Sequence, residues 1–180
     1  TVYGIGADAF DSAAVSALLT AKGRGRDMPV PVLVGSWSTV DGLVMSVSQQ
    51  ARKLIEAFWP GGLSLILRQA PSLNWDLGDV RGTVNLRMPL HPVALDLLRE
   101  IGPMAVSSAN TTGNPPAGTV GEAREQLGDS VSVYLDRGPT GEPVASTIVD
   151  LTQEQPAVLR EGAVSVAQLR EVLGTEITAG

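Results

Sequence analysis

The segment Lys22-Gly-Arg24-Gly-Arg26 places three cations within five residues, a pattern suited to binding an anion. An arginine can donate two parallel hydrogen bonds to phosphate oxygens, and a lysine binds them as a point charge. The spacing therefore predicts phosphate contacts by Lys22 and Arg24. Cations at the end of a helix also offset the helix dipole, and this simpler interpretation stays open.

A second group of polar residues, Ser107-Ser108-Ala109-Asn110, follows a predicted strand. Open α/β sheets bind ligands just beyond the carboxyl ends of their strands, so Ser108 and Asn110 are candidate ligand contacts. Gly113 favours a turn directly after them. Serine and asparagine side chains also commonly bond the backbone of their own turn, which is the alternative interpretation.

Two further arginines lie in predicted strands. Arg87 stands inside an alternating segment, and Arg160 ends an apolar one. Because a buried cation without a partner is costly, each either faces solvent or meets an anion in a cleft. The single histidine, His91, precedes Pro92 at the start of a predicted helix, where we expect a structural capping role.

The composition excludes several kinds of site. The 180 residues contain one His and no Cys. Thiolate zinc sites, iron–sulfur clusters, Cys nucleophiles and multi-His metal sites are therefore excluded, and we expect no metal site built from side chains. Neither of the two familiar glycine-rich phosphate loops is present. Positioned cations and polar groups are what remains for chemistry.

The charge pattern bears on partners and location. The formal net charge is −6, and no run of Lys or Arg stands out. Proteins that grip a nucleic-acid backbone concentrate cations on one face, so we expect no strong direct nucleic-acid binding. No apolar run approaches the length of a membrane span, and no leader pattern precedes the first helix, so we expect a cytoplasmic protein that does not enter the membrane.

Helix-like and strand-like segments alternate along the chain. Asp11 is a candidate N-cap for the first helix, and Ser46 or Ser48 for the second. This alternation predicts one α/β domain with a mixed sheet of about seven strands flanked by helices. We expect helices from 11 to about 22, from 46 or 48 to 58, and over 92–101, 119–127 and 165–173, with strands at 31–35, 63–68, 83–88, 104–108, 131–135, 146–151 and 157–160.

Seven short motifs, taken in order, cover nearly the whole chain and together resemble the YrdC family, the threonylcarbamoyl-AMP synthases. They are Thr1-Val-Tyr-Gly-Ile-Gly6; Lys22-Gly-Arg24 with Pro29; Phe58-Trp59-Pro60-Gly61; Leu86-Arg87-Met88-Pro89; Ser108-Ala-Asn110 with Gly113 and Pro115; Ser146-Thr147-Ile-Val-Asp150; and Leu159-Arg160-Glu161-Gly162.

The resemblance implies a single YrdC-like domain over residues 1–180, with a twisted sheet and an open ligand cleft. It also implies a first strand before Thr1, which we expect to be missing from this chain. The implied reaction condenses L-threonine, bicarbonate and ATP, with Mg²⁺, into threonylcarbamoyl-AMP and pyrophosphate. A tRNA threonylcarbamoyl transferase then uses the product to modify an adenosine of tRNA.

The resemblance also assigns roles to residues. It implies that Lys22, Arg24, Ser108 and Asn110 are catalytic. Leu33 departs from the family pattern, because many members have a histidine there that is thought to contact threonine. The implied ATP contacts are Arg24, Met28, Thr83, Ser108, Pro116 and Arg160; the implied threonine contacts are Thr1, Arg87, Val106 and Ser146.

Two other functions compete with the synthase. One is a non-catalytic RNA-binding module for ribosome maturation, and a net charge of −6 disfavours it. The other is a paralogue that binds a nucleotide and acts on another substrate. Retention of the Lys22–Arg24 and Ser108–Asn110 residues favours the synthase without excluding this paralogue.

Overall fold

The computed structural model describes residues 1–142 and 144–179. Its elements follow in the order β1 (Gly4–Asp8), α1 (Ser12–Ala21), β2 (Val32–Leu33), α2 (Ser38–Leu43), α3 (Gln49–Phe58), β3 (Leu63–Arg68), β4 (Thr83–Arg87), α4 (Pro92–Ile101), β5 (Met104–Ser108), α5 (Val120–Leu127), the 3-10 helix η1 (Gly128–Ser130), β6 (Thr147–Asp150), β7 (Ala157–Arg160), α6 (Val166–Leu173) and β8 (Thr178–Ala179).

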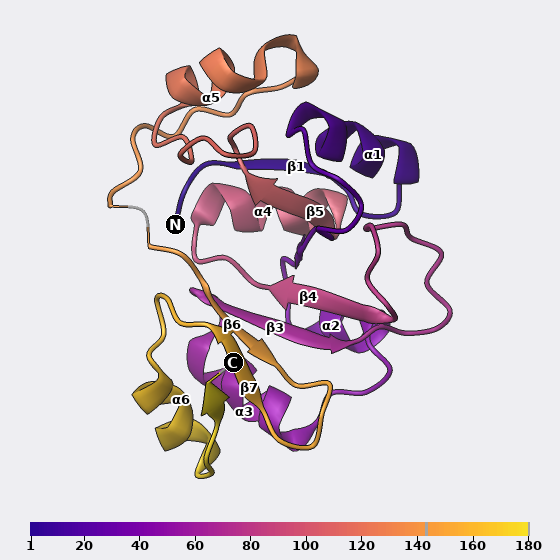
Figure 1. Cartoon of the computed structure of the whole chain (residues 1–180), viewed down its shortest axis with the longest axis vertical. Coiled ribbons are helices and arrows are strands. Elements are labelled where there is room, and N and C mark those ends of the chain that lie inside the picture. The colour runs from indigo at the N-terminus through magenta and orange to yellow at the C-terminus, as the bar shows by residue number, and fades with distance from the viewer. Residues whose placement is uncertain (143, 180) are drawn as a thin grey trace.

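The strands form one mixed sheet in the order β1-β5-β2-β4-β3-β6-β7-β8. The pairs β2–β4, β3–β6 and β7–β8 are parallel, and the other pairs are antiparallel. In Figure 1, α2, α3 and α4 lie behind the sheet, whereas α1 and α5 lie at its upper edge and α6 at its lower left. This confirms the predicted α/β class and the mixed sheet flanked by helices.

One face of the central sheet is apolar and fully buried. The register sets Val32 opposite both Leu86 and Ala105, and Leu65 opposite both Leu86 and Val149. All five side chains have 0% exposure. Because side chains alternate along a strand, their neighbours project from the opposite face, and these neighbours include Thr83, Asn85 and Arg87.

The predicted helix starts are largely confirmed. The Asp11 carboxylate accepts from the N–H groups of Ala13 and Ala14, and the Ser48 hydroxyl accepts from Ala51. Each cap satisfies backbone donors that have no partner within the helix. His91 occupies the N-cap position of α4, as expected, but its side chain makes no capping hydrogen bond.

The predicted strand at 131–135 is wrong. The segment runs from η1 toward β6 without pairing, and side-chain bonds fix it instead: the Tyr134 hydroxyl donates to Gly128 O at 2.8 Å, and the Tyr3 hydroxyl donates to Gly138 O at 2.7 Å. Val133 in the middle is 70% exposed, so the apolar alternation there marks no buried face. Strands β1 and β8 and helix α2, which the pattern did not predict, also form.

A helix needs about 20 consecutive apolar residues to span a membrane. Within residues 1–142 and 144–179, no helix is long and apolar enough to do so.

Candidate functional site

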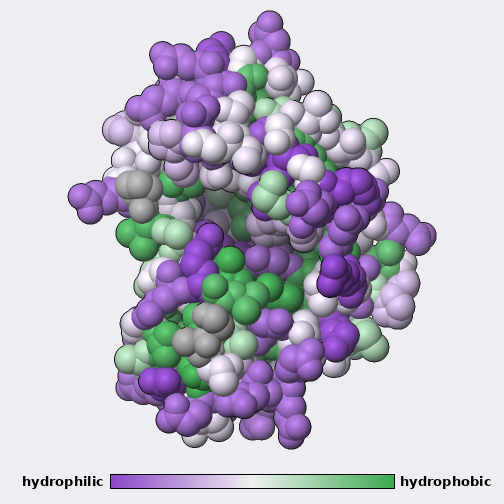
Figure 2. Space-filling model, in the orientation of Figure 1, coloured by the Kyte–Doolittle hydropathy of each residue, from purple (hydrophilic) through white to green (hydrophobic). Residues whose placement is uncertain are grey.

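The polar face of the sheet carries most of the predicted site. Thr83, Asn85 and Arg87 project from one face of β4, and Val106 and Ser108 project to the same side from β5. Strand β2 lies between these two strands, which are therefore roughly 10 Å apart. The space-filling view is hollowed across its middle, between the part that holds β1 and β5 and the part that holds β3 and β6 (Figure 2).

Lys22 ends helix α1 and turns inward toward the segment that follows β5. Its Nζ donates to Ser108 O and to Asn110 O, each at 2.6 Å, and lies 3.5 Å from Asn110 Oδ1. The residue is only 3% exposed. Burial, and then the nearby charge of Arg24, lower the pKa of the Lys22 ammonium from 10.5 to about 8. The helix-dipole interpretation therefore does not account for where this cation points.

Asn110 belongs to the same turn and bonds to it. Its Nδ2 donates to Thr111 O and to Asn114 O, both at 2.9 Å. The residue is 7% exposed. The Asn110 side chain therefore bonds its own turn, as in the alternative interpretation.

Arg24 and Ser108 are placed differently. The Arg24 Nη1 donates to Ser107 Oγ at 3.3 Å, and its Nε is buried without any hydrogen-bond partner among the described residues. Burial lowers the pKa of the Arg24 guanidinium. The Ser108 hydroxyl likewise has no hydrogen-bond partner in the described part of the chain. These two groups keep hydrogen-bonding capacity for a ligand.

Arg87 is fixed by the turn after α3. Its Nε donates to Gly61 O at 2.8 Å, and Gly61 N in turn donates to Met88 O at 2.8 Å. A Cβ at position 61 would overlap Phe58 O, which explains the glycine of the Phe58-Trp-Pro-Gly61 motif. Burial, and then the charge of Arg160, lower the pKa of the Arg87 guanidinium.

Arg160, at the end of β7, is held by Ser146. Its Nε donates to Ser146 O at 2.9 Å and its Nη2 to Ser146 Oγ at 3.0 Å. Ser146 is 8% exposed, and its hydroxyl also accepts from Ser64 Oγ at 3.0 Å. A Cβ at Gly162 would overlap Ala145 O, so the glycine of the last motif lets the chain pass close to Ser146.

The remaining predicted residues border the same region. Thr1 is exposed and lies three residues before β1, the strand that pairs with β5. The Thr83 hydroxyl donates to Val80 O at 2.7 Å, and the Val106 N–H is taken by Pro31 O at 2.9 Å. A ligand contact at Val106 would therefore need its carbonyl or its side chain.

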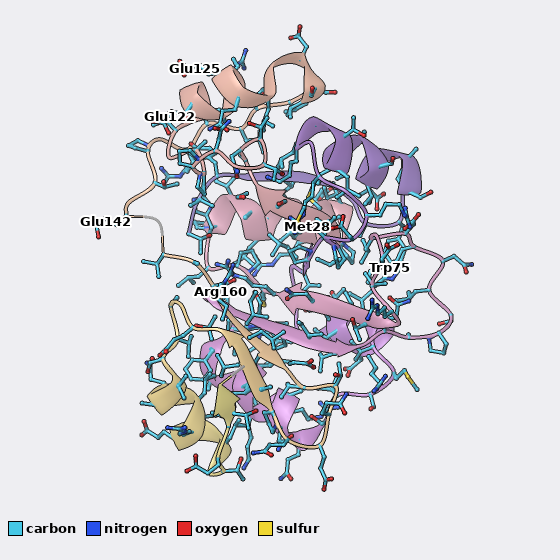
Figure 3. The ribbon with its side chains drawn as sticks, in the orientation of Figure 1. Met28, Trp75, Glu122, Glu125, Glu142 and Arg160 are labelled. Atoms are coloured by element: carbon cyan, nitrogen blue, oxygen red, sulfur yellow. The ribbon has the colours of Figure 1, made fainter. Side chains whose placement is uncertain are left out.

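Met28 and Pro116 lie in exposed loops at the edge of this region. In Figure 3, Met28 lies to the upper right of Arg160, and Trp75 lies further toward the right edge of the view, away from Arg160.

Three side chains that complete the site were assigned no role from the sequence, although Ser107 stands in the second polar group. Ser64 holds Ser146, and Ser107 accepts from Arg24. Asn85 lies between Thr83 and Arg87 on β4, and its Oδ1 is buried without a partner among the described residues. A polar residue inside an alternating strand was the available signal for Asn85, because a buried polar atom without a partner is unusual.

Four arginines outside the site form ion pairs, whereas the four cations of the site form none among the described residues. Arg26, Arg52, Arg99 and Arg170 each lie within 4.0 Å of a carboxylate. Within residues 1–142 and 144–179, no carboxylate oxygen comes that close to the site's four cations. Of these four cations, Lys22 is buried, Arg24 and Arg87 are half-buried, and Arg160 is exposed. Partly desolvated cations without a carboxylate partner favour an anionic ligand.

Known proteins share this chain's sequence and fold. The family model for the Sua5, YciO and YrdC proteins, described as telomere recombination, matches residues 1–162. A protein of Mycobacterium tuberculosis with the provisional name threonylcarbamoyl-AMP synthase is 68% identical over 176 residues, which are 98% of this chain and 81% of that protein. The Bacillus subtilis threonylcarbamoyl-AMP synthase is 38% identical over 97% of this chain and 51% of its own length.

A solved structure agrees closely in fold. The crystal structure of Pyrococcus abyssi Sua5 complexed with L-threonine has a TM-score of 0.93 and 34% sequence identity to this chain. The comparison covers 100% of this chain and 53% of that one. This chain therefore spans about half the length of the archaeal protein and of the Bacillus protein.

Proposed function

The chain belongs to the Sua5/YciO/YrdC family, and from that premise we propose that it is a threonylcarbamoyl-AMP synthase. The observation that carries the proposal is the set of four cations without carboxylate partners in the described chain: Lys22 and Arg24 beside β5, and Arg87 and Arg160 at the ends of β4 and β7. Two anionic substrates that must react with each other fit two neighbouring groups of cations. The relative complexed with L-threonine supports one of the two substrates.

The proposed reaction has two steps. The amine of L-threonine and bicarbonate give a carbamate and water. A carbamate oxygen then attacks the α-phosphorus of ATP, its bond to phosphorus forms, and the bond to the leaving pyrophosphate breaks. The enzyme is thus a nucleotidyltransferase. No side chain needs to become covalently attached, which suits a chain without Cys and with one His.

Catalysis in this scheme is positioning plus charge stabilisation. Arg24, with a free buried Nε, would bind the phosphates beside Ser108. Arg87, held through its Nε, would present its outer nitrogens to the threonine carboxylate. Further ATP contacts are proposed for Met28, Thr83, Pro116 and Arg160, and further threonine contacts for Thr1, Val106 and Ser146.

Mg²⁺ enters the proposal with ATP. No group of three or more His, Asp or Glu residues that could hold a metal ion occurs in residues 1–142 and 144–179. We therefore treat the ion as part of a magnesium–ATP substrate, in which it would neutralise charge that develops on the phosphates. The product would pass to a tRNA threonylcarbamoyl transferase, and we place both steps in the cytoplasm.

The test is a reaction with purified protein, ATP, Mg²⁺, bicarbonate and L-threonine. We expect pyrophosphate and threonylcarbamoyl-AMP in equal amounts, the second identified by mass spectrometry, and neither when threonine is omitted. Pyrophosphate release that ignores threonine would point to a paralogue with another substrate. Steeply salt-dependent tRNA binding without pyrophosphate release would point to the RNA-binding module.

A further inference from the structure

The segment from Ser108 to Pro116 is held from one side by Lys22. The ammonium group donates to Ser108 O and Asn110 O at 2.6 Å, and the backbone oxygen of Lys22 accepts from Thr112 N at 2.8 Å. An ammonium has three hydrogens, and two of them make short charge-assisted bonds here. The third has Asn110 Oδ1 as its nearest partner, at 3.5 Å. Lys22 is therefore committed to the protein backbone.

The same segment is held from the other side by Gln126 of α5. Its Oε1 accepts from Thr111 N at 3.1 Å, and its Nε2 donates to Pro115 O at 3.1 Å. Between the two holders, the Asn110 Nδ2 donates to Thr111 O and Asn114 O. The carbonyl and amide groups of this loop are thus engaged from both helices, whereas the Ser108 hydroxyl at its start is left without a partner in the described chain.

We propose that Lys22 and Gln126 are positioning residues that clamp this loop from α1 and α5 and act on the reaction through Ser108. The inference rests on the proposed synthase function. It changes the role expected for Lys22: the ammonium sets the direction of the Ser108 backbone and does not bind the phosphates, a task that falls to Arg24. It also adds Gln126, for which no sequence motif indicated a role.

The clamp matters because a small displacement of a substrate-contacting group has a large effect on rate. Misplacement of reacting groups by about 1 Å can cost about a hundredfold in turnover. Loss of the Lys22 donor would leave Ser108 O and Asn110 O without their short bonds inside the protein. Loss of Gln126 removes two longer, neutral bonds, so its effect is expected to be smaller.

The test compares Lys22→Met, Gln126→Ala and the control Glu125→Ala. Glu125 is the exposed neighbour of Gln126 on α5 and points away from the loop (Figure 3). We expect Lys22→Met to lower the kcat of threonine-dependent pyrophosphate release at least tenfold, with the Kd for magnesium–ATP changed less than about threefold. Gln126→Ala should lower kcat about threefold to tenfold, again with a smaller change in the Kd for magnesium–ATP. Glu125→Ala should have the same kcat and Kd as the unaltered protein.

A second measurement does not depend on activity. Hydrogen exchange of the peptide spanning residues 104–117 should be faster in Lys22→Met and Gln126→Ala and unchanged in Glu125→Ala. If the unaltered protein releases no threonine-dependent pyrophosphate, the proposed function fails while this exchange measurement still tests the clamp. A tenfold weaker Kd for ATP with kcat retained in Lys22→Met would make Lys22 a phosphate ligand and overturn the inference. Should Lys22→Met not fold, Gln126→Ala decides: kcat and exchange equal to those of Glu125→Ala would overturn it.

Discussion

The two cation pairs of the site differ in how the protein holds them. In the first cation pair, Lys22 and Arg24, one member binds two backbone carbonyls and the other keeps a buried Nε without a partner among the described residues. In the second cation pair, Arg87 and Arg160, each guanidinium is fixed through its Nε to a main-chain carbonyl, of Gly61 and of Ser146. In the first pair, Lys22 bonds the protein and Arg24 is left to bind a ligand. In the second pair, each arginine bonds the protein through its Nε and keeps its other nitrogens for a ligand.

The difference follows from the shapes of the two side chains. Arginine has five N–H donors in a planar fork, so one edge can bond the protein while the other faces a ligand. Lysine has a single compact ammonium, and once two carbonyls lie at 2.6 Å little capacity is left for a third strong partner. Because Lys22 uses its ammonium group to bond the protein backbone, a separate residue, Arg24, is needed to bind the ligand.

The largest expected effect breaks the first pair at its binding member. Arg24→Ala removes the cation whose Nε has no partner among the described residues, and we expect turnover to fall by about a hundredfold or more. The Kd for threonine should change little, because Arg87 and its bond to Gly61 O are intact. Arg26→Ala is the matched control, since that arginine is exposed and forms an ion pair with Asp76. Equal turnover in the two variants would refute the assignment of Arg24.

The second prediction breaks the second pair. Arg87→Ala should raise the KM for threonine by about tenfold to a hundredfold, because a hydrogen bond to a charged group contributes about 1.5–3 kcal/mol. The KM for ATP should rise less. Steady-state kinetics with each substrate varied in turn separates the two constants, and Arg99→Ala, an exposed arginine paired with Asp96, serves as the control. A larger effect on the KM for ATP than on the KM for threonine would contradict the assignment of Arg87 to threonine.

Much of the framework was predictable from the sequence. Strands β3 and β5 and helix α4 begin and end where the apolar pattern and the prolines predict. The grouping of Lys22 with Ser108 came from ordered motifs, and the structure brings these two residues together. The motifs assigned Arg87 to threonine and Arg160 to ATP, and the proximity of these two arginines was not predicted. Local patterns of this kind are readable because burial and capping act over a few residues.

The direction of each polar side chain was not predictable. No spacing rule distinguishes a lysine that binds carbonyls 86 and 88 residues away from one that binds phosphate. The strand predicted at 131–135 failed for a similar reason, because pairing depends on a free neighbouring edge that the sequence does not locate. Gln126 was missed because its two partners become neighbours only after α5 packs beside the loop.

The smallest expected effect concerns Asn85, which lies on β4 two residues before Arg87. Its Oδ1 is buried without a partner within residues 1–142 and 144–179, and such an atom costs about 1–3 kcal/mol of stability. Asn85→Leu, which has nearly the same shape, should therefore raise the free energy of unfolding by about 1 kcal/mol in urea titrations. The same change at the exposed Asn74 should alter it by less than about 0.5 kcal/mol.

Asn85 is also expected to contribute to turnover. A destabilising atom on the polar face of β4 is expected to persist only if a substrate uses it, so Asn85→Leu should lower threonine-dependent turnover while it stabilises the fold. In the proposal, the reacting carbamate joins a threonine bound at Arg87 to an ATP bound at Arg24, and an amide oxygen on the same face of β4 as Arg87 can accept the carbamate N–H. A variant that is more stable and equally active would show that the two pairs suffice without Asn85.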